Sequence, residues 1–354
     1  MTREYRKTPL LVKLTAALGS IVLFVVTAEL ALRLIDPELP YKNQFFPVNR
    51  NIDFPEFYKK DARLFWRLRE NQTVESRWFS NLSYQINSLG LRGPEVVKNK
   101  HGLRILALGN SCTFGWGVSF EKCCTNLLQK ELNETNPEDN IEVVNAGVPE
   151  YSSHQGKLFF EDLLSLKPDV VLIMYGWNDH WRAGQEIPDA EQNPHPQIII
   201  NLQNMTSRLM LYKFMRKATL TLIEDTTLVR MDDISGKRRV NPDEFSDNLK
   251  EIIKIAKENG IQPILVVPPM ASLEIYFAGM QSNFHMLHQR YQEIIIRAGL
   301  YQDVTVVNLL IPFEKHDDLY DDARGDPIHF NEKGHEIVAK TISDAIALLI
   351  DRLD

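Results

Sequence analysis

Five short apolar runs, separated by longer segments with helical spacing, constrain the fold of this chain most strongly. The runs are RILALG, IEVVNAG, DVVLIMYG, QPILVVPP and VTVVNLL, at residues 104–109, 141–147, 169–176, 262–269 and 304–310. Helices are expected near residues 120–134, 153–166, 243–259, 283–298 and 332–352. The apolar runs are not polar at alternate positions, which is typical of strands covered on both faces. Their alternation with helices predicts an α/β fold, a three-layer α/β/α domain with a central five-stranded, mostly parallel sheet.

The N-terminus contains a second strong signal, the apolar segment LTAALGSIVLFVVTAELALRLI at residues 14–35. Basic residues precede it at Arg3, Arg6, Lys7 and Lys13. Its two charged residues, Glu29 and Arg33, are four apart and can pair on a helix near its outer end. We expect a transmembrane signal-anchor helix, with residues 1–13 in the cytoplasm and the rest of the chain outside. A cleaved signal peptide and a buried helix of the soluble fold remain as alternatives.

Two further regions lie outside the strand and helix alternation. Residues 36–100 are rich in Pro, Asn, Arg and aromatic residues, so we expect a connector that packs on the domain at residues 101–354 through short extended pieces. The connector ends in the turn-rich stretch INSLGLRGPEV. Residues 180–242 are too long for a simple connection and are interpreted as an insertion. Within them, residues 203–224 can form an amphipathic helix, either packed on the surface or acting as a lid or membrane-contacting element.

Composition excludes several classes of function. The net charge is −7 and basic residues are mixed with acidic ones along most of the chain, so we expect no nucleic acid partner. The three cysteines, Cys112, Cys123 and Cys124, are too few for a disulfide framework; one bridge from Cys112 or three buried thiols are the alternatives. We find no zinc-ligand spacing and no glycine-rich phosphate loop, so no cofactor or metal is implied.

Polar residues follow several of the predicted strands, at the edge of a parallel sheet where ligands bind. They are Asn110 and Ser111 after the first strand, Asn145 after the second, and Asn178 and Asp179 after the third; Asp326 and His329 precede the last helix. Acyl transfer through serine needs a hydroxyl, a base beside it and a carboxylate that orients the base. We therefore expect Ser111 to be the nucleophile, His329 the base and Asp326 its partner.

The same chemistry needs donors for the oxyanion of the tetrahedral intermediate. We expect these to be the backbone N–H groups of Ser111 and Gly147 and the side-chain amide of Asn178. Asp179 is expected to brace the loop of Asn178. Aromatic residues near the strand ends can line the substrate site or pack in the core; the candidates are Trp116, Trp177, Trp181 and His180.

These residues resemble the SGNH hydrolases, the broad class of GDSL esterases named after a serine, a glycine, an asparagine and a histidine in four sequence blocks. The four fall on Ser111, Gly147, Asn178 and His329, and the resemblance spans roughly residues 103–347. It implies a flavodoxin-like sheet and serine ester hydrolysis. One position departs from the pattern, because Asn110 stands where the family usually has Asp; Asn keeps the acceptor and loses the charge.

The resemblance, together with the N-terminal segment and the connector, leads to a specific expectation. The chain is expected to be an exported, membrane-anchored esterase of the bacterial type, cleaving small acyl esters on a small molecule or glycan, for example O-acetyl groups in the cell envelope. The catalytic domain is then extracytoplasmic, in the periplasm or at the cell surface. A polysaccharide O-acyltransferase with the same triad and an inactive glycan-binding or scaffold protein are the alternatives. The sequence leaves the oligomeric state open.

Overall fold

The computed structural model describes residues 9–35, 56–76, 79–222, 235–271, 281–322 and 326–350. The chain divides into two compact units, Met1–Pro55 with Pro196–Thr227, and Glu56–His195 with Leu228–Asp354. The predicted cytoplasmic residues 1–8 and the first part of the connector, residues 36–55, lie outside the described residues.

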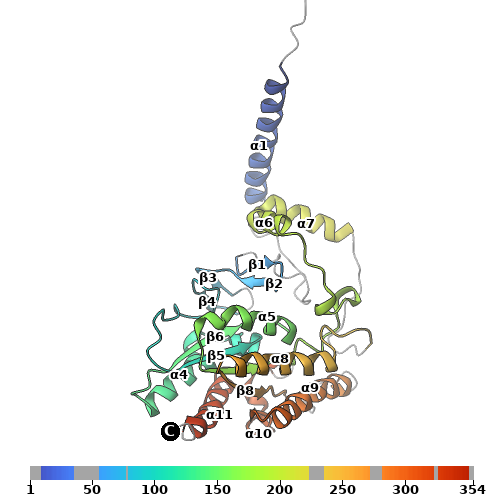
Figure 1. Ribbon diagram of the computed structural model, residues 1–354. Helices are drawn as coiled ribbons and strands as arrows, with labels where there is room; N and C mark the ends of the chain where they lie inside the picture. The colour runs from blue at the N-terminus through green and yellow to red at the C-terminus, as the bar shows by residue number, and fades with distance from the viewer. Residues whose placement is uncertain are drawn as a thin grey trace, which may run out of the picture. The chain divides into compact units, whose positions relative to one another are not determined.

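The larger unit contains a five-stranded parallel sheet (Figure 1). Its strands are β5 (Arg104–Gly109), β6 (Glu142–Gly147), β7 (Val170–Met174), β8 (Gln262–Val267) and β9 (Thr305–Asn308), in the order β6-β5-β7-β8-β9. Each pair of neighbours is parallel, which confirms the predicted sheet. Because β6 and β7 lie on opposite sides of β5, the order of the strands reverses at β5. Ligands of such sheets bind beyond the carboxyl ends at this reversal, where Ser111 follows β5.

Helices cover both faces of the sheet. On one face, α4 (Cys124–Thr135) packs against α11 (Glu332–Ile350); on the other, α8 (Pro242–Glu258) packs against both α5 (Ser153–Leu163) and α9 (Gln281–Gln302). The five predicted helices are therefore present, with boundaries shifted by a few residues. The core between α4, α11 and the sheet buries Ile105, Leu172 and Val266 of the strands with Leu128 and Val338 of the helices. Burying one such side chain contributes about 1.5–3 kcal/mol, so the sheet is fixed by many modest contributions.

The segment before the sheet forms two antiparallel hairpins. The first joins β1 (Tyr58–Asp61) to β2 (Phe65–Leu68), and the second joins β3 (Gln72–Glu75) to β4 (Ser83–Ile86). Phe57 and Tyr84 are fully buried and pack edge-on against Phe114, which lies just after β5. Aromatic residues of this segment therefore contact the region that carries Ser111.

Short elements complete the larger unit. They are α3 (Ser111–Phe114), α10 (Leu310–Phe313), the hairpin of β10 (Tyr320–Asp322) and β11 (Asp326–Phe330), and 3-10 turns at Phe120–Lys122, Leu164–Leu166, Gly184–Glu186, Asp189–Glu191 and Asp317–Leu319.

The smaller unit contains α1 (Leu10–Ile35), α6 (Gln197–Thr206) and α7 (Met210–Leu222). The helix α1 has 26 residues, a mean hydropathy of 2.2 in its most apolar stretch, and no buried residue, so it is an anchor or a signal sequence and not a core helix. It begins four residues earlier than predicted, because the carbonyl of Pro9 accepts the N–H groups of Val12 and Lys13. The amphipathic segment at 203–224 forms the end of α6 and all of α7 rather than one helix.

Candidate active site

The turn after β5 presents Ser111 as the first residue of the short helix α3. Asn110 caps this helix, since its Oδ1 accepts the N–H of Cys112 at 3.0 Å. Gly109 is needed before it, because a Cβ at this position would lie 2.0 Å from Oγ1 of Thr113 and 2.9 Å from the carbonyl of Met174. Local residues thus hold Ser111 at the carboxyl end of the sheet, and Asn110 supplies the acceptor expected of it.

Ser111, His329 and Asp326 form one chain of hydrogen bonds. Oγ of Ser111 lies 2.8 Å from Nε2 of His329, and Nδ1 of His329 lies 2.6 Å from Oδ2 of Asp326. The other oxygen of Asp326 accepts the backbone N–H groups of Ile328 and His329 at 3.2 and 3.1 Å. Burial raises the pKa of Asp326, but His329 and these hydrogen bonds outweigh burial and leave the pKa below its ordinary value. The structure therefore brings together the three residues predicted for serine acyl transfer.

The side-chain amide of Asn178 lies in the loop after β7, the strand next to β5. Its Nδ2 donates to the carbonyl of Tyr151 at 3.0 Å. An amide nitrogen has two N–H groups, so this hydrogen bond fixes the side chain and leaves a second donor.

Gly147 has a different role from the one predicted. Its backbone N–H donates to Oδ1 of Asn145 at 3.0 Å. A Cβ on Gly147 would lie 2.2 Å from the backbone nitrogen of Phe114, so glycine is required by the close approach of β6 to α3. The prediction of Gly147 as an oxyanion donor is wrong, because this N–H is already engaged inside the fold.

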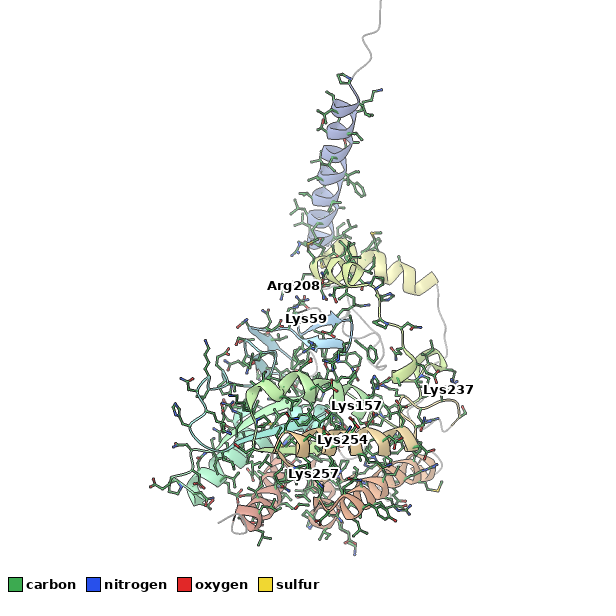
Figure 2. All side chains as sticks on the ribbon, viewed as in Figure 1. Lys59, Lys157, Arg208, Lys237, Lys254 and Lys257 are labelled. Carbon is green, nitrogen blue, oxygen red and sulfur yellow. The ribbon has the colours of Figure 1, made fainter. Side chains whose placement is uncertain are left out.

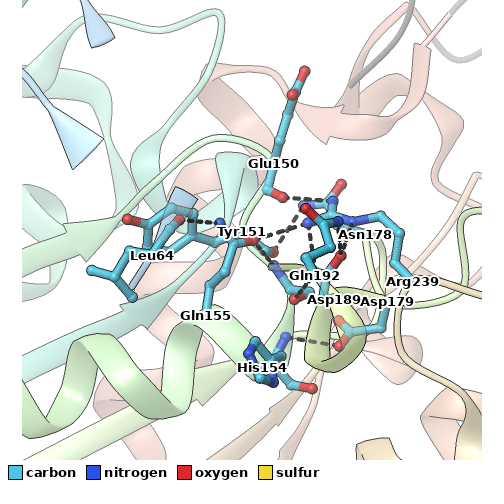
Figure 3. A network of polar contacts seen from close by, with 12 residues as sticks. Leu64, Glu150, Tyr151, His154, Gln155, Asn178, Asp179, Asp189, Gln192 and Arg239 are labelled. Carbon is cyan, nitrogen blue, oxygen red and sulfur yellow. Dashed lines mark hydrogen bonds and ion pairs between the residues drawn. The ribbon is translucent and has the colours of Figure 1, made fainter. Parts of the chain in front are cut away.

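The loop after β6 is held by a buried ion pair that sequence reasoning missed (Figure 3). Arg239 and Asp189 are each 1% exposed, and Nη2 of Arg239 lies 2.8 Å from Oδ2 of Asp189. Arg239 also donates to the carbonyl of Glu150 at 2.8 Å and to Oε1 of Gln155 at 2.9 Å. The hydroxyl of Ser152 donates to the same Asp189 oxygen at 2.6 Å. The pair therefore ties Glu150, Ser152 and Gln155 to residues of the predicted insertion.

Asp179 braces the loop of Asn178, as predicted from its place in the sequence. Oδ1 of Asp179 accepts the N–H of Ser153 at 2.7 Å, and Oδ2 accepts the N–H of Gly176 at 2.9 Å. Burial raises its pKa to about 6, while the hydrogen bonds and Arg239 act in the opposite direction. The carboxyl joins the loops that follow β6 and β7.

The four predicted substrate-lining residues separate into two groups. Trp116 is half-buried, stacks on Tyr84 and has its ring centroid 6.5 Å from that of His329, so it lies beside the triad. The other three are buried: Trp177, Trp181 and His180 are 1%, 9% and 0% exposed. Of the two alternatives for these three residues, their burial favours packing in the core, because nearness in sequence to a strand end does not show which way a side chain points.

Trp177 and His180 pack on His288. The Trp177 ring stacks on His288 with centroids 3.6 Å apart, and Nε2 of His180 lies 3.2 Å from Nδ1 of His288. Burial lowers the pKa of His180 well below its ordinary value and that of His288 to about 3, so the pair is neutral. These side chains form part of the core behind the loop of Asn178.

Arg92, from the stretch INSLGLRGPEV, holds the other end of the nucleophile helix. Its buried guanidinium donates to the carbonyls of Phe114, Gly115 and Val118, the last two at 2.6 Å. It also lies over the ring of Phe114. Since the last carbonyls of a helix have no intrahelical partner, Arg92 satisfies groups that would otherwise be buried alone.

One group among the described side chains is close enough to share a metal ion. The ligand atoms of Cys123, Cys124 and His335 lie within 4.8 Å of one another, and all three residues are buried. However, Nδ1 of His335 accepts the backbone N–H of Cys124 at 3.2 Å, and burial lowers the pKa of His335 to about 3. The three cysteines are free and buried, which agrees with the second alternative for them. This cluster is accounted for by core packing, and we assign it no metal.

Comparison with known proteins places this geometry in a family. The model of the GDSL-like lipase/acylhydrolase family matches residues 107–337, well over half of the chain. No curated protein matches this chain. Among solved structures, a lipase/acylhydrolase from Enterococcus faecalis is 18% identical, with 69% of this chain and 95% of that chain covered and a TM-score of 0.45.

Two other solved structures give similar values. An acetylxylan esterase from Geobacillus stearothermophilus, solved as a catalytic mutant, is 18% identical, with 70% and 94% covered and a TM-score of 0.45. The esterase EstA from a Pseudoalteromonas species is 15% identical, with 70% and 98% covered and a TM-score of 0.44. The extent of the family match is decisive: this chain belongs to the GDSL-like lipase/acylhydrolase family and is an enzyme that hydrolyses esters.

Proposed function

We propose that the protein cleaves small acyl esters through a covalent intermediate on Ser111. The observation that carries the proposal is the chain of hydrogen bonds from Asp326 through His329 to Ser111. His329 takes the proton of the Ser111 hydroxyl as its oxygen attacks the ester carbonyl, and then gives it to the leaving alcohol. Asp326 holds the imidazole in the tautomer with Nε2 free to accept. Water then attacks the acyl group by the same route and releases the acid.

The oxyanion of each tetrahedral intermediate is stabilised by the backbone N–H of Ser111 and the side chain of Asn178. Among the described residues no acceptor is seen for the N–H of Ser111, and Asn178 donates one of its two N–H groups to the carbonyl of Tyr151. Removing one such donor typically lowers kcat by about 100- to 1000-fold. Trp116, beside His329, supplies an aromatic face on which a sugar ring or an acyl group can rest. An ester-bearing glycan, such as an O-acetylated one, is the substrate class that we propose.

The enzyme is anchored in a membrane by α1, with the N-terminus in the cytoplasm and the catalytic unit outside. The 26 residues of α1 extend about 39 Å as a helix, more than the roughly 30 Å of a bilayer core. The basic residues that precede and begin α1 favour this orientation. The contact between α1 and α7 favours a retained anchor over a cleaved signal, since Glu29 of α1 accepts the N–H of Leu211 at 2.9 Å.

The proposal is tested by labelling the full chain with a fluorophosphonate and locating the adduct by mass spectrometry. We expect the adduct on Ser111 and none in Ser111→Ala, together with a fall in ester hydrolysis of at least about 10⁴-fold. Ser165→Ala is the matched control, because Ser165 is exposed on the 3-10 turn after α5. No adduct on a folded wild-type chain would instead support a binding protein without turnover.

Hydrolysis and transfer are distinguished by the products. With a glycan acceptor present, a hydrolase releases free acid, whereas an O-acyltransferase forms acylated acceptor from the same acyl-enzyme. We expect free acid as the main product.

A further inference from the structure

The outer end of α1 packs against α7 along one helical face. The half-buried residues of α1 are Val25, Ala28, Glu29 and Leu32; its other described residues are exposed. Steps of three and four residues place these four on one side of a helix. Glu29 is 12% exposed there, its Oε1 pairs with Arg33 at 2.7 Å, and its Oε2 accepts the N–H of Leu211. The first turn of α7 is therefore attached to the end of α1 that leaves the bilayer in our proposal (Figure 1).

The helix α6, which ends only a few residues before α7 begins, carries an exposed apolar face. Ile198, Leu202 and Met205 are spaced by four and three residues and are 76%, 53% and 74% exposed. On α7, Phe214 and Met215 are also largely exposed. Large apolar side chains gathered on one face in this way mark an interaction site rather than an ordinary protein surface.

The charge of this region differs from that of the whole chain. The sequence from Gln192 to Ile223 contains no acidic residue and four basic ones, Arg208, Lys213, Arg216 and Lys217, although the chain as a whole has a net charge of −7. Arg208 lies at the turn between α6 and α7 (Figure 2). Arg208 is exposed, whereas Lys213 is buried. An apolar face beside an exposed basic side chain is complementary to a bilayer surface that contains anionic lipids.

We propose that α6 and α7 lie on the surface of the bilayer that α1 spans, with Ile198, Leu202 and Met205 inserted between the headgroups and the acyl chains. This inference rests on the proposed membrane anchor. The bilayer is favoured over a second copy of the chain because the first turn of α7 is attached to the outer end of α1, and because the sequence from Gln192 to Ile223 has basic residues and no acidic one. The anchor then consists of one spanning helix and one helix lying in the interface.

The test uses the full chain in nanodiscs that contain phosphatidylglycerol, with single cysteines labelled by an environment-sensitive fluorophore. Labels are placed at Leu18→Cys in α1, Met205→Cys in α6 and Lys250→Cys on the exposed face of α8. The native cysteines are buried, so they do not compete for the label under native conditions. Ester hydrolysis by each labelled chain serves as the control for folding.

We expect spin labels deep in the acyl chains to quench the Leu18 label, and spin labels near the headgroups to quench the Met205 label. Aqueous iodide should quench the Lys250 label alone. If lipid spin labels quench the fluorophore at position 18 while iodide quenches the fluorophore at position 205, this inference is overturned and the anchor remains. A Met205 label protected from both quenchers would also overturn it, since protein would then cover α6. If lipid spin labels do not quench the fluorophore at position 18, the proposed membrane anchor is wrong, and this inference is wrong with it.

Discussion

The turn of Ser111 and the imidazole of His329 are each oriented by a near neighbour in the sequence, whereas the loop from Glu150 to Gln155 is held by residues far away. Asn110 caps the turn of Ser111, and Asp326 orients a histidine three residues further on. The loop after β6 instead depends on Arg239 and Asp189, which are 50 residues apart and almost fully buried. Local motifs thus build the reacting side of the site, and a long-range ion pair in the interior positions the loop that contacts Asn178.

The largest expected effect tests the catalytic residues, which are oriented by neighbours in the sequence. Asp326→Asn keeps the shape of the side chain but favours the wrong tautomer of His329, so we expect kcat on a small ester to fall by about 10⁴-fold with little loss of stability at neutral pH. Asp318→Asn is the matched control, because this carboxylate is 63% exposed and pairs with His316 rather than with His329. If Asp326→Asn kept a tenth of the wild-type rate, the proposed role of Asp326 would be wrong.

The buried ion pair that holds the loop after β6 is tested by Arg239→Met. The substitution leaves Asp189 buried without its cation, which typically costs about 3–5 kcal/mol of unfolding free energy, measured by urea denaturation. The double variant Arg239→Met with Asp189→Leu removes both charges and should recover most of this loss. As a control, Lys250→Met breaks an exposed pair with Asp247 and should change stability by less than about 1 kcal/mol. Equal losses in Arg239→Met and Lys250→Met would contradict a structural role for the buried pair.

This contrast explains how much the sequence alone could predict. The strands and helices of the sheet were predictable because apolar runs and helical spacing are local signals. Ser111 was predictable because strand ends in a parallel sheet meet at one edge, where ligands bind. His329 and Asp326 lie on β11, outside that sheet, and were predicted from the residue types that serine acyl transfer needs and from the family resemblance. Arg239 and Asp189 could not be predicted, since nothing within a few residues of either one indicates that they pair.

The errors in the predicted site have a common physical cause. A glycine at a strand end can be required for an exposed N–H or for close packing, and Gly147 proved to be of the second kind. Likewise, Trp116 and Trp177 both follow strand ends, but one lies beside His329 and the other is buried against His288. Side-chain direction in loops is set by tertiary contacts, which residue type and spacing do not record.

A smaller effect is expected for the pH dependence of the unfolding free energy, to which Asp179 contributes. Burial raises the pKa of Asp179 from its ordinary 3.8 to about 6, so the folded protein holds this proton more tightly than the unfolded chain. The resulting stabilisation is fully present below about pH 4 and is lost as the pH rises through about 6. The full change is about 3 kcal/mol.

Asp179→Asn has no carboxyl to titrate, so its unfolding free energy should lack this loss between pH 4 and pH 7. The comparison uses the pH slope rather than the absolute stability, because the amide has one acceptor oxygen for the two N–H groups of Ser153 and Gly176. Parallel pH profiles for the two proteins would show that Asp179 is ionised throughout this range.

The smallest effect concerns the cap of the nucleophile helix. Asn110→Ala removes the acceptor for the N–H of Cys112, and loss of such a cap costs about 1 kcal/mol. Asn110→Ser restores an acceptor and should recover part of the loss, which thermal unfolding of the three proteins can measure. Hydrolysis should follow the same order, because the cap fixes the turn that carries Ser111. If Asn110→Ala cost as much stability as Arg239→Met, Asn110 would be more than a local cap. The contrast between the turn of Ser111 and the loop after β6 would then be wrong.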